Sequence, residues 1–451
     1  MLRISFNVIL LTLGSLLLSY GLIHVVSTYM NEDGDQKVLF QTSISHPSLL
    51  GGESQKTFIK VDLTGFTFEQ HAERAPVNVA LVLDKSGSMN GEKMEQAKAA
   101  AMQAVDMLTE RDKLTIVTYD SHVQVLVPAT PVANKSAIKN QIRQIQANGG
   151  TALYGGVVTG ANQLREYLNG TGVHRVILLS DGQANEGPST PEELGNLGAT
   201  LIQDNISVTT IGLGLGYNED LMVQLAMRSD GNHNFVEHAD MLAGVFNQEF
   251  GDVMSVVAQD VKVQFNLEEG FRPISVQGRE ATIDGQHVEV SLNQLYGNQD
   301  KYVLLEIETT PEERNGEYEV ATVALSYDNV VTEREDQFEN IVVAEFTNSQ
   351  AEVDNNVDAE TMVSAIEQQA VMNEERAIRL RDLGKREEAE VVLRQNASYL
   401  KENAELYDSD RLSGYAVKSQ EAATSLDDAE WKKQRKAMRS DHYKTKTQQN
   451  N

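Results

Sequence analysis

The strongest constraint on the fold is a repeated alternation of apolar runs and amphipathic stretches between residues 77 and 250. The run 77–83 (VNVALVL) is almost wholly apolar, which is typical of a strand covered on both faces. The stretch 91–108 then carries apolar side chains at helical spacing. Further strands are expected at 113–119, 175–179 and 206–213, and further helices at 135–147, 153–168, 191–203, 218–227 and 240–250. This α/β rhythm predicts a doubly wound, mainly parallel sheet.

Oxygen-bearing side chains gather where these strands should end and helices should begin. Five of them stand in the strings LVLDKSGSM, NGGTALYGG and VILLSDGQANEG, namely Asp84, Ser86, Ser88, Thr151 and Asp181. In an open α/β sheet, the loops at the carboxyl ends of the strands meet in one crevice. Carboxylates and hydroxyls without His or Cys suit a hard divalent cation, with Mg²⁺ preferred over Mn²⁺ or Ca²⁺. The plain alternative is a set of loop carboxylates and helix-capping serines.

The first three of these residues occupy alternate positions. In a loop that leaves a strand, alternation places Asp84, Ser86 and Ser88 on one side, while Lys85 and Gly87 face away or relieve crowding. If the Lys85 amine instead reached over the rim of the site, it would favour an acidic partner.

The order D-x-S-x-S, then a distant Thr151, then a distant Asp181, resembles the metal-ion-dependent adhesion site of von Willebrand factor A domains. The stretches GGTALYGGV, LLSDGQANEG and TTIGLGLGYNEDLMVQLA are similar to the A domains of bacterial relatives of two groups. These are the calcium-activated chloride channel group and the inter-alpha-trypsin inhibitor heavy-chain group. The resemblance implies a metal-dependent binding domain.

The resemblance also implies a role for each of the five residues. Ser86, Ser88 and Thr151 would be direct ligands of Mg²⁺ in the open state of the family. Asp84 and Asp181 would act largely through bound water. One coordination position would then be left for a Glu or Asp of a protein partner, which gains Coulomb energy at the exposed ion.

Charge and composition exclude several classes of partner. The 451 residues hold 38 Lys and Arg against 66 Asp and Glu, a formal net charge of −28, which argues against nucleic acid. The chain has no cysteine, so disulfides, zinc–thiolate sites and thiol nucleophiles are ruled out.

The N-terminal sequence predicts export. The uncharged segment that starts at Phe6 and ends at Val26 would span about 31 Å as a helix. Arg3 precedes it and acidic residues follow it, which places the body outside the cytoplasm. We expect an uncleaved anchor in the inner (cell) membrane, with the body in a bacterial periplasm or outside the cell. A cleaved signal peptide, with Ser19 and Gly21 beside the cut, is the alternative.

Beyond residue 251 the pattern changes to period-2 strands separated by turns, which predicts an antiparallel β-sandwich. The strand expected at 57–62 most simply joins this sandwich, so the A domain would be inserted into it. From residue 354 two helices joined at 383–385 predict a helical hairpin, and a basic tail follows. The predicted segments are an anchor (1–30), a linker (31–45), the first part of the sandwich (46–75), the A domain (76–251), the rest of the sandwich (252–348), a helical region (349–426) and the basic tail (427–451).

The sequence leaves two alternatives to metal-dependent binding, a hydrolase and a channel-related protein. Asp84 at a strand end is similar to the nucleophile of haloacid-dehalogenase-type phosphatases, but those carry D-x-D and Ser86 stands here. The chain has no H-E-x-x-H, P-loop or G-x-S-x-G motif. A chloride-channel role would require one apolar segment to line a pore by oligomerising. We therefore expect a non-enzymatic, membrane-anchored adhesion or scaffold protein, with a metal-dependent hydrolase or a channel-related membrane protein as alternatives. The basic tail is expected to be a solvated helix end or to bind an acidic partner or lipid headgroups.

Overall fold

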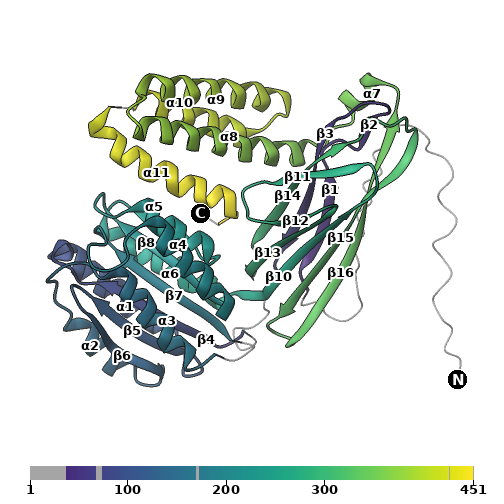
Figure 1. The fold of residues 1–451 in the computed structure, drawn as a ribbon. Coiled ribbons are helices and arrows are strands. Elements are labelled where there is room, and N and C mark those ends of the chain that lie inside the picture. Colours follow the sequence, from purple (N-terminus) through teal and green to yellow (C-terminus); the bar gives the residue numbers. More distant parts are fainter. Residues whose placement is uncertain (1–36, 68–73, 169–171, 426, 450–451) are drawn as a thin grey trace, which may run out of the picture.

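The computed structural model describes residues 37–67, 74–168, 172–425 and 427–449 (Figure 1). It contains three parts: an α/β domain, a pair of β-sheets and a layer of C-terminal helices. The α/β domain lies at one end of the molecule, and the helical layer lies above it and beside the sheets.

The α/β domain is built on a six-stranded sheet of order β6-β5-β4-β7-β8-β9. Its strands are β4 (Val77–Asp84), β5 (Lys113–Tyr119), β6 (Val123–Pro131), β7 (Val173–Ser180), β8 (Ile206–Leu213) and β9 (His233–Val236). All pairings are parallel except that of β5 with the edge strand β6. The predicted doubly wound, mainly parallel sheet is therefore confirmed, with an antiparallel hairpin at one edge that the sequence had not indicated.

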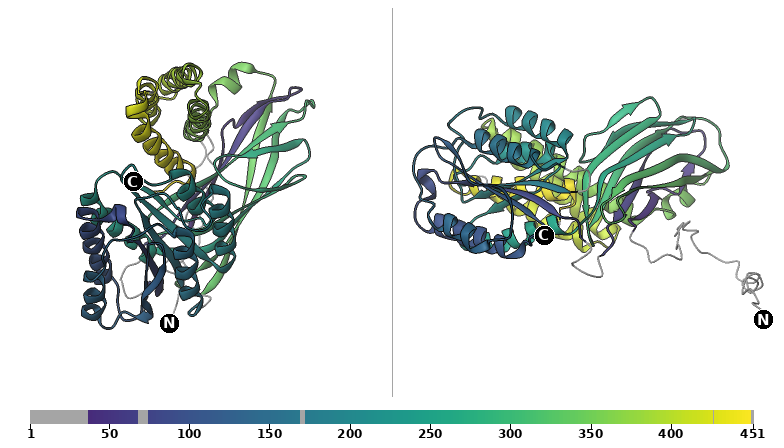
Figure 2. Two further views of the ribbon diagram at one scale, coloured as in Figure 1. Left: turned by 60° about the vertical axis from the view of Figure 1, so that its left-hand side comes forward. Right: turned by 90° about the horizontal axis from the view of Figure 1, so that it is seen from below.

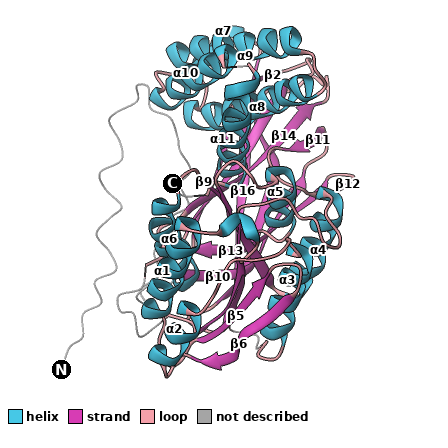
Figure 3. Ribbon diagram, turned by 90° about the vertical axis from the view of Figure 1, so that its left-hand side faces the viewer, coloured by secondary structure: helices cyan, strands magenta, loops and turns pink. Residues whose placement is uncertain are grey.

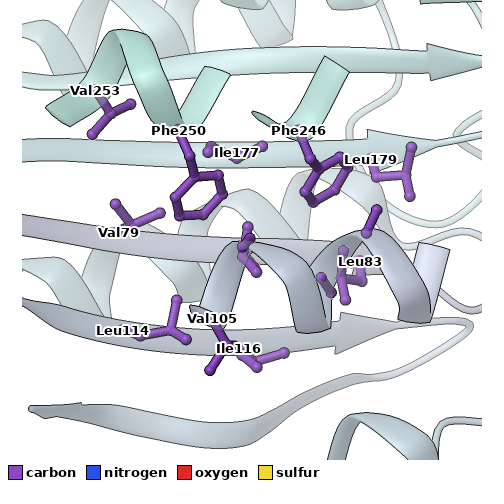
Figure 4. Close-up of a cluster of buried hydrophobic side chains, with 14 of the residues drawn as sticks. Val79, Leu83, Val105, Leu114, Ile116, Ile177, Leu179, Phe246, Phe250 and Val253 are labelled. Carbon is purple, nitrogen blue, oxygen red and sulfur yellow. The ribbon is translucent and has the colours of Figure 1, made fainter. Parts of the chain in front are cut away.

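Helices cover both faces of this sheet, which explains why every residue of β4, β7 and β8 is buried. They are α1 (Glu92–Met107), α2 (Lys135–Arg143), α3 (Leu153–Arg165), α4 (Pro191–Leu201), α5 (Glu219–Arg228) and α6 (Leu242–Met254). Alternate residues of β4 point to opposite faces, so Val79 packs with α1 and α6 whereas Val82 packs with α3. Figure 3 shows the two helical layers, and Figure 4 shows Phe246 and Phe250 of α6 against the strands.

Helix α2 ends at Arg143, earlier than the predicted residue 147. The residues that follow are held by loop contacts instead. Asn148 donates its backbone N–H to the carbonyl of Lys85, and Gly87 donates to the carbonyl of Gly149. These bonds tie the loop before Thr151 to the loop after β4, so they bring two of the predicted site loops together.

The β-sandwich consists of two sheets, of order β1-β3-β14-β11 and β12-β13-β10-β15-β16-β2. Their strands are β1 (Leu39–Ile44), β2 (Ser48–Leu50), β3 (Lys56–Thr64), β10 (Val256–Leu267), β11 (Phe271–Val276), β12 (Thr282–Asp284), β13 (His287–Tyr296), β14 (Asp300–Thr309), β15 (Gly316–Asn329) and β16 (Arg334–Thr347). Every pairing is antiparallel except that of β16 with β2. Strand β3 pairs with β14, so the α/β domain is inserted between β3 and β10 as predicted.

The prediction of a linker at 31–45 was wrong for residues 39–44. They form β1, which pairs along its whole length with β3. Phe40 and Ile44 are buried in the sandwich core while Leu39 and Gln41 are exposed. The mostly polar composition of 31–45 does not indicate this strand, because its pairing partner β3 lies later in the sequence.

The C-terminal region holds more helices than the predicted hairpin. After α7 (Gln350–Asn355) come α8 (Ala359–Asp382), α9 (Arg386–Leu406), α10 (Asp410–Thr424) and α11 (Asp428–Thr447). Helices α8 and α9 meet at 383–385 as expected, where Gly384 has a φ of +80° that suits glycine. Helix α11, within the predicted basic tail, packs on the α/β domain and on α8 and is not a solvated end (Figure 2).

The predicted membrane anchor from Phe6 to Val26 lies outside the described residues. Among the residues that are described, no helix is long and apolar enough to cross a bilayer.

Candidate metal-ion site

The five predicted site residues lie at the carboxyl edge of the parallel sheet. Asp84 is the last residue of β4, and Asp181 follows the last residue of the adjacent strand β7. Ser86 precedes and Ser88 lies within a single 3₁₀ turn (Gly87–Met89) between β4 and α1. Thr151 lies two residues before α3. The fold therefore brings together residues that lie up to 97 positions apart in the chain, from Asp84 to Asp181.

Asp84 is fully buried and both of its carboxylate oxygens accept hydrogen bonds. The Ser86 backbone N–H donates to Oδ1 at 2.8 Å, and the Ser180 hydroxyl donates to Oδ2 at 2.7 Å. Burial raises the pKa of Asp84 above its ordinary value, and the bonds from Ser86 and Ser180 oppose that rise. Both of these hydrogen-bond donors are neutral, so they stabilise the Asp84 carboxylate without cancelling its negative charge.

Three further side-chain oxygens, from Ser86, Ser88 and Asp181, lie in a row, each within hydrogen-bond distance of the next. The Oγ atoms of Ser86 and Ser88 lie 3.0 Å apart, and the Ser88 hydroxyl donates to Oδ1 of Asp181 at 2.6 Å. Thr151 reaches the same place from the other side. A methyl group added at Gly182 would lie 3.4 Å from Ser88 Oγ and 3.6 Å from Thr151 Oγ1. All five predicted side chains therefore converge around the loop that carries Asp181 and Gly182.

Thr151 is held by Asn185, which is not one of the five predicted site residues. Asn185 accepts the Thr151 backbone N–H at Oδ1 (2.7 Å), and its own N–H donates to the Thr151 carbonyl (3.2 Å). Thr151 is only 3 % exposed, and these two bonds fix its backbone beside the loop that carries Asp181. The sequence does contain a signal for the role of Asn185, since it stands four residues after Asp181 in the same loop, DGQANEG.

Two lysines near the site have unforeseen partners. Lys93, in the first turn of α1, lies with Nζ 2.5 Å from Oδ2 of Asp181. Lys85 is paired with Asp120 instead of reaching over the rim or remaining solvated. The pair also explains why the pKa of Asp120 is lowered, since the hydrogen bond and charge of Lys85 outweigh its partial burial. One lysine thus engages a site carboxylate directly and the other does not.

The donor set suits a hard divalent cation. Within the described part of the chain, no three His, Cys, Asp or Glu side chains cluster in a way that could hold a metal, so soft or imidazole-rich coordination has no support there. The site offers two carboxylates and three hydroxyls. Carboxylate and neutral oxygen ligands are the ones that Mg²⁺ and Ca²⁺ prefer. The residues present therefore fit the ion that the sequence predicts.

Comparison with known proteins identifies the α/β domain. Residues 78–248 match the family model of the von Willebrand factor type A domain. An uncharacterized protein from Synechocystis sp. is 26% identical over 274 residues, which cover 58% of this chain and 64% of that protein. The uncharacterized protein YfbK from Escherichia coli is 26% identical over 51% of this chain and 41% of its own length.

Animal proteins are also similar to this chain. The human inter-alpha-trypsin inhibitor heavy chain H3 is 26% identical over 239 residues, which cover 48% of this chain and 26% of the heavy chain. The chain thus spans less than two thirds of the length of each of these relatives.

Two solved structures share the architecture over most of the chain. A von Willebrand factor type A protein from Catenulispora acidiphila superposes with a TM-score of 0.68 at 17% identity, covering 88% of this chain and 91% of that one. The ArnB paralog VWA2 from Sulfolobus acidocaldarius gives a TM-score of 0.61 at 19% identity, covering 91% and 98%. At such identities the likeness establishes the fold alone. Taken with the family match, it shows that this chain carries a von Willebrand factor type A domain, inserted in a β-sandwich and followed by helices.

Proposed function

We propose that this chain is an exported, membrane-anchored binding protein whose A domain holds an acidic side chain of a protein partner through Mg²⁺. The observation that carries the proposal is the run of oxygens from Asp84 through Ser86 and Ser88 to Asp181 at the carboxyl edge of the sheet. Thr151 joins it across Gly182. A bound divalent cation would supply positive charge that attracts a carboxylate.

The five site residues would serve this function in two ways, by offsetting the charge of the cation and by coordinating it. Asp84 and Asp181 bring two negative charges, which offset the charge of the cation. Ser86, Ser88 and Thr151 contribute neutral oxygens, so they coordinate without cancelling the charge that a partner's carboxylate would meet. Thr151 lies in a loop outside the apolar core clusters of the domain, so replacing it should leave that core packed.

A cross-linked pull-down from membranes tests this function. The full-length chain should capture its partner in Mg²⁺ and lose it in EDTA. Thr151→Ala should also lose the partner in Mg²⁺. Thr200→Ala is a matched control, because the Thr200 hydroxyl bonds to the carbonyl of Asn196 within its own helix α4. Equal capture by Thr151→Ala and Thr200→Ala, with Mg²⁺ still required, would contradict the assignment of Thr151.

The non-enzymatic part of the proposal has its own test. We propose that no hydrolysis occurs at the site. A nucleophilic aspartate of the phosphatase type belongs to a D-x-D pattern, and here Ser86 stands in place of the second Asp. A phosphatase assay of the full-length chain with Mg²⁺ should show no turnover above that of Asp84→Ala. Turnover that depends on both Mg²⁺ and Asp84 would instead support a hydrolase. The proposed membrane anchor, from Phe6 to Val26, is tested by carbonate extraction of cell membranes, which should leave the chain in the pellet.

A further inference from the structure

Helix α11 connects the helical layer to the A domain through its basic face (Figures 1 and 2). Arg435 forms ion pairs with Glu219 and Asp220 of α5, and with Asp382 at the end of α8. Arg439 lies 3.0 Å from the Asp220 carboxylate. The basic residues of α11 therefore form ion pairs within the same chain, with Asp382 and with two acidic residues of α5 that stand more than 200 positions earlier in the sequence.

Lys436 is the most deeply buried of these basic side chains, with 1 % of its surface exposed. Its Nζ donates to the Tyr217 carbonyl at 2.6 Å and to the Glu219 carboxylate. The same ammonium lies 4.1 Å from the centre of the Tyr217 ring, which is a cation–π contact. A buried ammonium is costly unless it is paired and hydrogen-bonded, so Lys436 holds the start of α5 firmly in one arrangement.

The segment bonded to Lys436 packs against the backbone of Asp181, one of the predicted metal ligands. Gly216 immediately precedes Tyr217, and it lies so close to Asp181 that a methyl group at Gly216 would collide with the carbonyl oxygen of Asp181. Gln183, in the loop after β7, donates its side-chain N–H to the Gly216 carbonyl at 2.6 Å. A single peptide unit thus separates the contact with α11 from the contact with the Asp181 loop.

We propose that Lys436 is a positioning residue for the metal site, acting through Tyr217 and Gly216 on the loop that carries Asp181. Docking of α11 and binding of the divalent cation are then linked. The cation binds more tightly when α11 is docked, and by reciprocity the bound cation holds α11 more firmly. This inference rests on the proposed metal site and names its regulation: whatever displaces the C-terminal helix weakens metal-dependent capture of the partner.

Mn²⁺ titration calorimetry on the full-length chain tests the linkage. Lys436→Met keeps the apolar stem and removes the charge, and Glu219→Gln removes the charge of its partner. Each should weaken Mn²⁺ binding about 5- to 10-fold, at the low end of typical coupling between sites. Lys418→Met is the matched control, because it breaks an ion pair between α10 and Asp441 of α11 without contacting the A domain in that pair. It should bind Mn²⁺ as the wild type does.

Hydrogen–deuterium exchange supplies a second readout, which does not depend on measured affinities. In the wild type, Mn²⁺ should slow exchange in residues 431–447, and Lys436→Met should lose that protection. Wild-type chain that binds Mn²⁺ with no change in this segment, or folded Lys436→Met and Glu219→Gln with wild-type affinity, would overturn the linkage alone. Wild-type chain that fails to bind any divalent cation would instead contradict the proposed function on which the linkage rests.

Discussion

The two ends of the A-domain sheet are both polar, but their charges are arranged in opposite ways. At the carboxyl end, Asp84 is surrounded by neutral hydroxyl and amide donors. At the amino end, Arg175 near the start of β7 is fully buried and donates to Gln294 and to the Tyr296 hydroxyl of the sandwich strand β13. Even with Lys93 beside Asp181, the two carboxylates leave the first end with net negative charge that an outside cation can balance. The second end contains charges of both signs and joins two domains.

At the amino end, Arg175 belongs to a network of buried hydrogen bonds and not to a single ion pair. Arg175 also donates to the Thr209 hydroxyl, which in turn donates to the Glu249 carboxylate at 2.9 Å. Asn232 and Asn234 donate to the same carboxylate. Because every link is buried, removing one member leaves others without partners in a region of low polarity. The comparison teaches that a polar cluster with internal compensation stabilises an interface, whereas one without it can bind a ligand.

The largest expected effect comes from breaking the compensated end. Arg175→Met should lower the free energy of unfolding by about 3–5 kcal/mol, the cost of leaving a buried charge such as Glu249 uncompensated. Urea denaturation measures this. Arg143→Met, which removes a guanidinium bonded to Asn140 on the exposed side of α2, should change stability by less than about 0.5 kcal/mol. Similar stabilities for the two variants would refute the distinction between the ends.

The next effect should appear at the carboxyl end and spare the fold. Thr151→Ala should weaken Mn²⁺ binding by at least about 10- to 100-fold, a loss that already follows removal of groups that merely support metal ligands. Its unfolding midpoint in urea should remain near that of the wild type, because the hydroxyl faces the site and not the core. Calorimetry checks the expected loss of Mn²⁺ affinity, and urea denaturation checks that the stability is unchanged. A strongly destabilised Thr151→Ala protein would show that this end, too, is structural.

The pH dependence of stability should arise mainly from the amino end. Burial, together with the neighbouring charge of Glu249, raises the pKa of Asp252 to about 7. The unfolded carboxyl titrates near 3.8, so the native state binds more protons between these values. Stability should therefore fall as pH rises from about 4 to about 7. Asp252→Asn should remove this fall and be more stable than the wild type at about pH 7.5, by at least about 1 kcal/mol.

Denaturation midpoints measured across this pH range check the sign. Asp260→Asn is a suitable control, because Asp260 is exposed and paired with Lys262 on strand β10. A wild-type protein whose stability rises between pH 4 and 7, with no difference in Asp252→Asn, would show that another group dominates.

The carboxyl end was predictable from the sequence because its signals are local. Asp84, Ser86 and Ser88 are spaced by strand and turn geometry within five positions, and each remaining loop follows a recognisable strand or precedes a helix. The same periodicity established the doubly wound sheet and its insertion in the sandwich. None of these inferences required knowing which distant residues are in contact.

The amino end and α11 were not predictable in the same way. Arg175 occurs in an apolar run, and its partners in β13 lie about 120 positions later. The charge reversal in the tail was visible, but its acidic partners Glu219 and Asp220 stand more than 200 positions earlier. Strand β1 was missed for the same reason, since only pairing with β3 explains it. Compensation between distant charges is a property of the fold and leaves no local pattern.

The smallest effect tests whether the carboxyl end is wholly uncompensated. Lys93 is the exception there, since its ammonium lies 2.5 Å from Oδ2 of Asp181 and shares that oxygen with any bound cation. Lys93→Met should therefore tighten Mn²⁺ binding by about 5-fold, as expected when a partly exposed competing charge worth about 1 kcal/mol is removed. Lys85→Met is the matched control, because Lys85 pairs with Asp120 and should leave the affinity unchanged. Weaker binding in Lys93→Met would mean that this lysine orients Asp181 for the cation and does not compete with it.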